Sequence, residues 1–399
     1  MIYTFGGYEL DVDAHELRRS EEVVRIEPQV FDVLAYLVEH RSRVVSKQEL
    51  LDAVWQTSFV TEATLTSRIK AARQAVGDDG SAQRVIRTSH GRGYRFVAPV
   101  EAFAAAAEEP RQGSEPNGHQ PITQDIRFCR SADGVQVAYA TSGSGPALVK
   151  TANWLSHLDY DWESPVWRHW LHALSERHRL IRYDERGCGL SDWNVERLSL
   201  ESKIADLDAV VEACRLERFQ LLGISGGGPT SVAYAALYPD RVTHLVLYGA
   251  FAQGRQVRAQ TVAAKREAEL MLELAEVGWG QDDPAFRRVF TTQFMPNSTS
   301  EQWEAFDELQ RRTSSPQNAA RIMAATGMLD VVDIAPQVRV PTLVLHARGD
   351  RRSPIEQGRL LAALIPDARL VTLDSSNHIL QADEPAWQRF LEELNAFLG

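Results

Sequence analysis

The chain reads Leu-Leu-Gly-Ile-Ser-Gly-Gly-Gly-Pro from Leu221 to Pro229. The apolar residues at its start predict a buried strand, and the alanine-rich segment that follows, up to Leu237, predicts a helix. A strand that turns directly into a helix at a serine needs glycine on both sides. Side chains at Gly223 or Gly227 would clash where the backbone folds back. The stretch therefore predicts one strand–turn–helix unit of an α/β sheet.

Ser225 stands at the centre of this G-x-S-x-G pattern. We expect the turn to present its hydroxyl at the carboxyl edge of the sheet as a nucleophile, with the N–H of Gly226 free to bind an oxyanion. The alternative is a glycine-rich loop that only packs a helix on a strand. The strand and helix in the required order favour the nucleophile.

The composition is that of a soluble globular chain of two or three domains, with 399 residues, 44% apolar and 24% charged. Its three cysteines, Cys129, Cys188 and Cys214, form no spaced pair, so we expect neither disulfides nor a metal site, and a reducing compartment. We see no signal peptide and no apolar run of the ~20 residues that a membrane span needs. The expectation is a cytoplasmic protein with no membrane partner and no cofactor.

The net charge of −11 argues against nucleic-acid binding by the chain as a whole, but the charge is unevenly distributed. Residues 1–100 carry 13 Lys and Arg against 14 Asp and Glu. Within residues 63–95 there are seven basic and two acidic residues, so this window can attract a phosphate backbone.

The first hundred residues predict a small antiparallel sheet, three helices and a hairpin. The sheet comes from the alternating runs Tyr3–Leu10, Glu16–Arg19 and Val23–Ile26. Helical spacing of apolar residues follows at 30–38, a capping box at Ser46 opens a helix to Trp55, and a third helix spans Glu62–Val76. Val85–Ser89 and Tyr94–Val97 then bracket a basic tip, His90-Gly91-Arg92-Gly93.

This order resembles the winged-helix effector domain of OmpR/PhoB-type response regulators over residues 3–98. Its strongest marks are Phe31–Leu34, Ser46–Trp55, Arg68–Arg73 and Gly91–Phe96. The resemblance implies double-stranded DNA as a partner, with the third helix in the major groove and the wing at the minor groove. The residues it assigns to DNA are Thr64, Ser67, Arg68 and Lys70 on the helix and Arg92 on the wing, with Arg73 on a phosphate. The alternative is a solvated basic face of a protein-binding module.

In that family a receiver domain with a phosphoacceptor aspartate precedes the module. Here the module begins at residue 3, so we expect regulation to come from the C-terminal side. Residues 101–122, rich in Ala, Glu, Pro and Gly, predict a flexible linker between the two parts.

From residue 123 the chain alternates strands and helices, which predicts a doubly wound parallel sheet in two parts, 123–250 and 336–399. The predicted strands are Ile126–Arg130, Val135–Thr141, Ala147–Thr151, Leu180–Tyr183, Phe219–Gly223, Leu245–Tyr248, Thr342–His346 and Leu370–Leu373. Residues 251–335 interrupt this pattern with four helices, Ala263–Val277, Asp283–Phe290, Glu301–Arg312 and Pro316–Gly327, which predict a helical cap.

Asp350 and His378 follow two late strands. A serine needs an imidazole to take its proton and a carboxylate to orient that imidazole, and the order Ser225, Asp350, His378 is the one expected in α/β-hydrolases. With the Asp184–Ser191 loop, which matches D-x-R-G-x-G-x-S, the chain resembles that superfamily over residues 125–399.

Other residues near these motifs have structural explanations. Asp330 and Asp333 could replace Asp350 as the acid, but surface or capping roles are favoured. Asp184 and Arg186 are expected to fix loop geometry, and Cys188 to pack, because it has no neighbour that would activate a thiol.

The family usually has His-Gly after the third strand, where a backbone N–H completes the oxyanion hole. Here Ala152-Asn153-Trp154 stands instead, so Asn153 or Trp154 must supply that N–H and the oxyanion loop is atypical. Two groups of apolar residues either line a pocket or only pack the core. They are Trp154, Tyr160, Trp162, Trp167 and Trp170 on the core side and Phe290, Phe294, Met295, Trp303 and Met323 on the cap side, with Trp154 the best pocket candidate.

Together these features predict a homodimeric transcription regulator whose hydrolase domain senses a small-molecule ligand and, if the triad turns over, hydrolyses it as an ester-like substrate. One rival is a serine hydrolase whose winged helix serves only recruitment. The other is a ligand-binding sensor with an idle triad, which the missing glycine favours and the intact Ser225, Asp350 and His378 set opposes.

Overall fold

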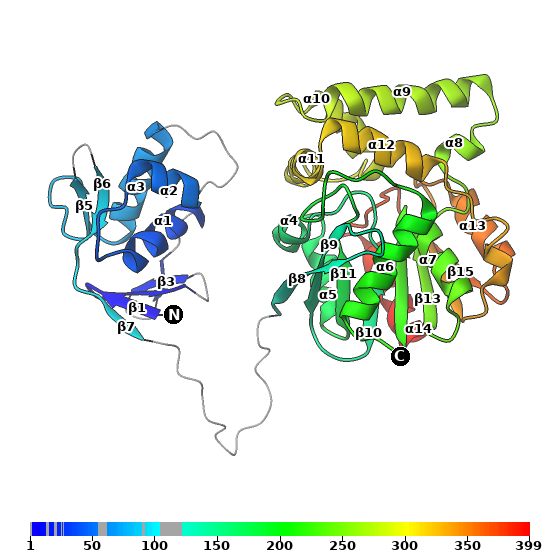
Figure 1. Ribbon diagram of the computed structural model, residues 1–399, viewed down its shortest axis with the longest axis horizontal. Coiled ribbons are helices and arrows are strands. Elements are labelled where there is room, and N and C mark those ends of the chain that lie inside the picture. Colours follow the sequence, from blue (N-terminus) through cyan, green and yellow to red (C-terminus); the bar gives the residue numbers. More distant parts are fainter. Residues whose placement is uncertain are drawn as a thin grey trace, which may run out of the picture. The chain divides into compact units, whose positions relative to one another are not determined.

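The computed structural model describes all residues except 1, 13–15, 20–21, 25, 27, 55–61, 90–91 and 104–121. The chain divides into two compact units, Met1–Gly118 and His119–Gly399 (Figure 1). Most of the predicted linker lies outside the described residues.

The first unit combines a five-stranded antiparallel sheet, in the order β4-β3-β2-β1-β7, with three helices and a two-stranded hairpin. This is the winged helix-turn-helix arrangement that the sequence predicts. Its elements are β1 (Ile2–Phe5), β2 (Tyr8–Asp11), β3 (Glu16–Arg19), β4 (Glu22–Val23), α1 (Pro28–Glu39), α2 (Lys47–Val54), α3 (Glu62–Ala75), β5 (Ile86–Ser89), β6 (Gly93–Phe96) and β7 (Glu101–Phe103).

Two details of this unit differ from the sequence prediction. The run Tyr3–Leu10 forms two strands, because Gly6 and Gly7 turn the chain with φ of 55° and 81°, a left-handed conformation that glycine adopts without strain. Strand β7 occupies the first three residues of the predicted linker and pairs with β1. That pairing joins segments about a hundred residues apart, so no local sequence pattern predicts it.

The apolar side chains of α3, with that of Val76 just beyond it, belong to the core of the first unit. Leu65, Ile69, Ala72 and Val76 are all buried and belong to one cluster with the apolar face of α1. The hairpin lies against this core through Gly93, where an added Cβ would come within 2.0 Å of the Val45 carbonyl oxygen. Burial of these side chains thus holds α3 and the hairpin together as one rigid piece.

The second unit is built on an eight-stranded sheet in the order β15-β14-β13-β12-β10-β11-β9-β8. All eight predicted strands are confirmed, with the first two antiparallel and the rest of the ladder from β11 to β15 parallel. They are β8 (Gln124–Arg130), β9 (Gln136–Ser142), β10 (Ala147–Lys150), β11 (Arg179–Tyr183), β12 (Phe219–Ile224), β13 (Val242–Tyr248), β14 (Thr342–Ala347) and β15 (Arg369–Leu373).

Helices cover both faces of this sheet, so every residue of the central strands β12 and β14 is buried. The helices of the core are α4 (Leu158–Glu163), α5 (Arg168–Ser175), α6 (Leu200–Ala213), α7 (Gly227–Leu237), α13 (Ile355–Leu364) and α14 (Pro385–Leu398), with a 3-10 turn at Ala335–Gln337. None of the helices in the described part of the chain combines the length and apolar character that crossing a bilayer requires.

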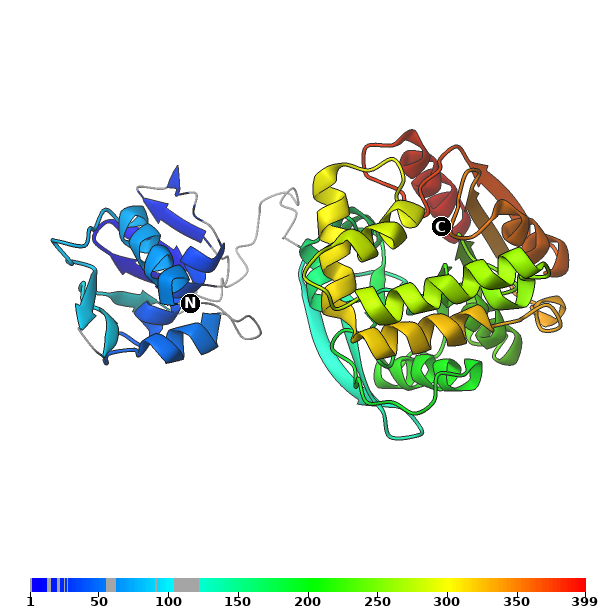
Figure 2. The ribbon, with the colours of Figure 1, turned by 90° about the horizontal axis from the view of Figure 1, so that it is seen from above.

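Between β13 and β14 the chain leaves the sheet and forms five helices, which Figures 1 and 2 show gathered on one side of the unit. They are α8 (Arg255–Arg258), α9 (Val262–Gly278), α10 (Ala285–Phe294), α11 (Ser300–Thr313) and α12 (Pro316–Gly327). The four predicted helices are confirmed. The short helix α8 was not foreseen, because four residues are too few to show a period.

Candidate functional site

Ser225 occupies a sharp turn between β12 and α7. Its φ of 50° lies in the left-handed region, which costs a non-glycine residue energy and persists only where the surroundings hold it. Its N–H donates to the carbonyl oxygen of Tyr248 at 2.9 Å, which ties the turn to the end of β13. The side chain is buried but lines a cavity.

The glycines around Ser225 are required by close backbone packing, as the sequence predicts. A Cβ on Gly223 would lie 2.6 Å from the Ser231 hydroxyl, and one on Gly227 would lie 2.8 Å from the Ala152 carbonyl oxygen. Gly226 is the N-cap of α7, where backbone N–H groups lack partners within the helix.

His378 and Asp350 meet at the ends of neighbouring parallel strands, β15 and β14. The Nδ1 atom of His378 lies 2.6 Å from Oδ2 of Asp350, and both side chains are buried. The other carboxylate oxygen, Oδ1, accepts the backbone N–H groups of Arg352 and Ser353 at 2.8 and 2.9 Å. The carboxylate is thereby fixed, and an ionised Asp350 places the imidazole proton on Nδ1 and leaves Nε2 as an acceptor.

The Nε2 atom of His378 is buried and has no hydrogen-bond partner among the described residues. The residue lines a small cavity of about 10 Å³ together with Ser225, Asn153 and Trp154. No hydrogen bond joins Ser225 to His378 in the part of the chain that is described, a looseness common in ligand-free sites. The structure thus brings the predicted nucleophile, base, acid and oxyanion loop to one place.

The two alternative acids lie elsewhere. Asp330 is exposed and accepts the N–H of Val332 at 3.0 Å and the Nε2–H of Gln253 at 2.9 Å. Asp333 is also exposed. Both have the surface or capping roles that were favoured for them.

The Asp184–Ser191 loop supports the site without facing the cavities. Asp184 accepts the backbone N–H groups of Leu158 and Leu190 at 3.1 and 2.8 Å. Arg186, fully buried, forms ion pairs with Asp206 and Asp133 at 2.6 and 2.7 Å. These contacts fit the expected role in loop geometry. Cys188 is fully buried, and burial raises the pKa of its thiol, in agreement with a packing role.

The atypical oxyanion loop lies directly against the nucleophile turn. Lys150 donates to the side-chain oxygen of Asn153, and Asn153 donates onward to the Leu155 carbonyl oxygen at 3.5 Å. Burial lowers the pKa of Lys150 to about 8, against the opposing attraction of Asp161. A buried polar network therefore holds the Asn153 side chain and orients the backbone that follows it.

A second cavity, of about 40 Å³, adjoins Ser225 on the cap side. Four of the aromatic and methionine residues that the sequence suggested line these cavities. Trp154 and Phe294 line both cavities, Trp167 lines the smaller one and Met323 lines the larger one. The others pack in the surrounding core; they are Tyr160, Trp162, Trp170, Phe290, Met295 and Trp303.

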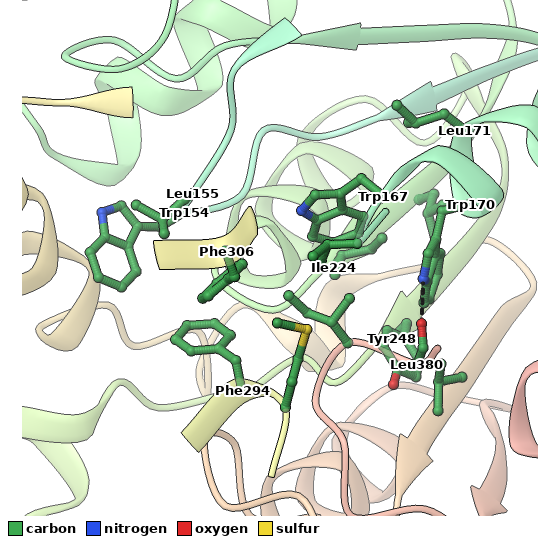
Figure 3. Packing of buried hydrophobic residues seen from close by; sticks show 14 of the residues in the cluster. Trp154, Leu155, Trp167, Trp170, Leu171, Ile224, Tyr248, Phe294, Phe306 and Leu380 are labelled. Atoms are coloured by element: carbon green, nitrogen blue, oxygen red, sulfur yellow. Dashed lines mark hydrogen bonds between the residues drawn. The ribbon is translucent and has the colours of Figure 1, made fainter. Parts of the chain in front are cut away.

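Figure 3 shows how this core surrounds the site. Trp154, Phe294 and Phe306 lie near one another, and the Phe294 and Phe306 rings are 5.1 Å apart. Trp170 stands apart from them and donates from Nε1 to the Leu380 carbonyl oxygen at 3.0 Å.

Sequence reasoning missed three basic residues of the larger cavity. Arg255, Arg258 and Arg352 line it beside Ser225 and Gly226. Two of them lie on the unforeseen helix α8 and the third follows the acid loop, so no motif links them.

The predicted DNA-contacting side chains lie in the first unit. Ser67, Lys70 and Arg92 are exposed and Arg68 is half-buried. Thr64 lies in α3, but its side chain is outside the description, as are His90 and Gly91 at the tip of the hairpin.

Arg73 was expected to contact a phosphate, and the structure corrects this. Its side chain is only 8% exposed and donates to the Ile86 carbonyl oxygen at 3.0 and 2.8 Å and to the Thr88 hydroxyl at 2.8 Å. The hairpin folds back over this end of α3, so Arg73 fastens the hairpin to the helix.

Comparison with known families agrees with both units. The model of the C-terminal domain of transcriptional regulatory proteins matches residues 21–96, and the model of the alpha/beta hydrolase fold matches residues 162–385.

Among individual proteins, a pyrrolizixenacetamide deacetylase of Xenorhabdus hominickii is 29% identical over 66% of this chain and 94% of its own length. The transcriptional regulator HilA of Salmonella typhi is 39% identical over 27% of this chain, a segment that is 19% of that regulator. The crystal structure of a hydrolase from Pseudomonas aeruginosa superposes with a TM-score of 0.58 at 25% identity, over 69% of this chain and 98% of that one. The chain belongs to the α/β-hydrolase fold family and carries an OmpR/PhoB-type transcription-regulator domain at its N-terminus.

Proposed function

We propose that the protein is a DNA-binding transcription regulator whose hydrolase domain senses a small ester- or amide-like ligand and cleaves it through Ser225, His378 and Asp350. One observation carries this proposal above all. Asp350 orients His378 at 2.6 Å, the Nε2 atom of that histidine has no partner among the described residues, and His378 lines the same cavity as Ser225. An idle binding pocket needs no such arrangement.

The proposed chemistry is acyl transfer. His378 Nε2 takes the proton of the Ser225 hydroxyl as its oxygen attacks the ligand carbonyl, and Asp350 stabilises the imidazolium that forms. The N–H of Gly226, with that of Asn153 or Trp154, binds the oxyanion. His378 then gives the proton to the leaving group, and water releases the acyl group by the same steps. The deacetylase named among the relatives supports a ligand with an acyl group.

Lys70→Ala and Arg92→Ala are each expected to weaken binding to a duplex fragment selected from a random library with the full-length protein. Both side chains are exposed on α3 and the hairpin, and each lost phosphate contact should lower the slope of log affinity against log salt by about one. Gel shifts at several salt concentrations measure this. Arg18→Ala, on strand β3, is the matched control, and unchanged affinity and slope in both variants would refute the interface.

Ligand in the hydrolase site is expected to change DNA affinity, because the cap is tied to the catalytic loops. The backbone N–H of His378 donates to the Phe294 carbonyl oxygen of α10 at 2.7 Å, and that of Asn297 donates to the Asn377 side chain at 3.0 Å. A cap that moves with ligand therefore moves the histidine loop, and we propose that it also changes how two copies pair over two half-sites.

Covalent occupation of Ser225 by a bulky fluorophosphonate is expected to shift affinity for the selected fragment by roughly 5–150-fold, the usual range of such coupling. The control is the Ser225→Ala protein treated in the same way. If labelled and unlabelled wild-type protein bind the fragment with equal affinity, the hydrolase domain is not the sensor. The alternative of a serine hydrolase whose winged helix serves only recruitment is then favoured.

A further inference from the structure

Three arginines line the larger cavity beside Ser225. Arg255 and Arg258 come from helix α8, and Arg352 lies in the loop after β14, two residues beyond the proposed triad acid Asp350. All three are partly buried and line the same cavity as Ser225. Such a concentration of like charge is unusual beside a nucleophile that handles neutral ligands.

The protein itself neutralises little of this charge. Arg255 donates to the Gln293 side chain at 3.3 Å and lies 3.6 Å from Glu267, whose side chain is 69% exposed. Among the described residues, Arg258 donates to two backbone carbonyl oxygens, those of Gln253 and Arg352, at 2.9 and 3.5 Å. Within the described part of the chain, neither Arg258 nor Arg352 has a carboxylate oxygen within 4.0 Å of its guanidinium nitrogens.

Arg352 is held by aromatic rings instead of an acid. Its guanidinium carbon lies 5.6 Å from the centre of the Trp154 ring and 5.1 Å from that of Phe294, distances of cation–π contact. Burial, with repulsion from Arg255 and Arg258, lowers the pKa of Arg352 to about 9, so the group is still charged at neutral pH. The nearest acid, Asp350, is already engaged by His378 and two backbone N–H groups.

Clustered cations that lack neutralising acids destabilise a fold, and proteins retain them where function needs them. Three further lining residues, Gln256, Thr326 and Trp154, each have a buried polar side-chain atom without a hydrogen-bond partner among the described residues. Met271, Met323 and Phe294 make the rest of the wall apolar. The lining therefore suits a ligand with an apolar body and an anionic end.

We propose that the ligand cleaved at Ser225 carries a carboxylate, as in the half-ester or half-amide of a dicarboxylic acid, and that Arg352 with Arg255 and Arg258 binds it. This inference rests on the proposed function and names its substrate class. The cavity of about 40 Å³ holds only a few water molecules, so the ligand enters by displacing lining side chains or cap segments. Arg352 then exchanges the faces of Trp154 and Phe294 for the carboxylate.

The test separates binding from turnover by using full-length Ser225→Ala protein with monoethyl adipate and diethyl adipate in titration calorimetry. The half-ester is expected to bind at least about tenfold more tightly, because its carboxylate can accept charge-assisted hydrogen bonds that the diester cannot. Arg352→Gln, introduced into the Ser225→Ala protein, should remove the preference for the half-ester over the diester, whereas Arg352→Lys should retain part of it. Arg359→Gln, an exposed arginine on α13, is the control.

The proposal is overturned if the half-ester does not bind, or if both esters bind equally. Arg352→Gln is expected to unfold at no lower temperature than the parent, since it removes one of three like charges that line one cavity. If it does not fold, Arg258→Gln takes its place in the same titrations.

Hydrolysis by the wild-type protein distinguishes this proposal from the proposed function. Mono-4-nitrophenyl adipate should be cleaved with a higher kcat/KM than 4-nitrophenyl hexanoate, and Arg352→Gln should abolish that difference. If the wild-type protein cleaves the two esters with equal kcat/KM and Arg352→Gln does not change this ratio, the anionic ligand is refuted and the hydrolase function stands. Selective binding of the half-ester with cleavage of neither ester overturns the hydrolase and leaves the anionic ligand.

Discussion

Replacing Ser225 by alanine is expected to lower kcat for 4-nitrophenyl esters by about four to six orders of magnitude, as loss of a serine nucleophile does elsewhere. The turn that holds Ser225 is strained, with φ of 50°, and is hemmed in by Gly223 and Gly227, so the backbone should keep its shape when only the hydroxyl is lost. Esterase kinetics and labelling by a fluorophosphonate probe both measure the effect.

The control is Ser300→Ala, which removes an exposed hydroxyl at the start of α11 and should leave kcat and labelling unchanged. Labelling of wild-type and Ser225→Ala protein to the same extent would show that the nucleophile lies elsewhere. If neither protein is labelled and no ester is cleaved, the idle sensor is the better explanation.

Replacing Asp350 by asparagine is expected to lower kcat by about 10⁴, with little change in fold. An asparagine can donate its N–H to Nδ1 of His378, which moves the imidazole proton to Nε2. The histidine then has no lone pair for the Ser225 proton. The two backbone N–H groups that Oδ1 accepts, from Arg352 and Ser353, should keep the loop in place.

Asp330→Asn is the matched control, because Asp330 is the exposed acid that the sequence left as an alternative. Kinetics of both variants with one ester decide between the two acids. A loss in Asp330→Asn as large as that in Asp350→Asn, or no loss in Asp350→Asn, would contradict the triad acid proposed here.

The cap adjoins both proposed catalytic side chains. The backbone N–H of His378 donates to the Phe294 carbonyl oxygen of α10, and Met323 and Thr326 of α12 line the larger cavity together with Ser225. A ligand that moves the cap would therefore act on the proposed base and on the surroundings of the proposed nucleophile.

Much of the architecture followed from local sequence. The eight strands, the four long cap helices and the glycines around Ser225 were all predicted, because hydrophobic period and turn chemistry act over a few residues. The sequence also pointed to the proposed triad residues, since each lies in the segment after a strand and parallel strands end at one edge of the sheet.

Residue type alone misled the prediction for Arg73. It lies on the same helix as Lys70, within a basic window, and only the hairpin that folds over it makes it a structural residue. The sequence analysis assigned the residues of strand β7 to the linker. The strand forms by pairing with β1, which lies at the other end of the unit in sequence, so the local pattern does not show it.

The arginines that line the larger cavity show most clearly what could not be predicted from the sequence. Arg255 and Arg258 precede Arg352 by almost a hundred residues, and neither helix α8 nor the loop after β14 has a period or motif that marks a ligand site. The sequence by itself determined the two domain types, the order in which the motifs follow the strands along the chain, and the turn at Ser225. These features depend on residues that are neighbours in the chain. Only the tertiary structure decided which cations surround Ser225, because the return of the chain from β13 through the cap to β14 brings them together.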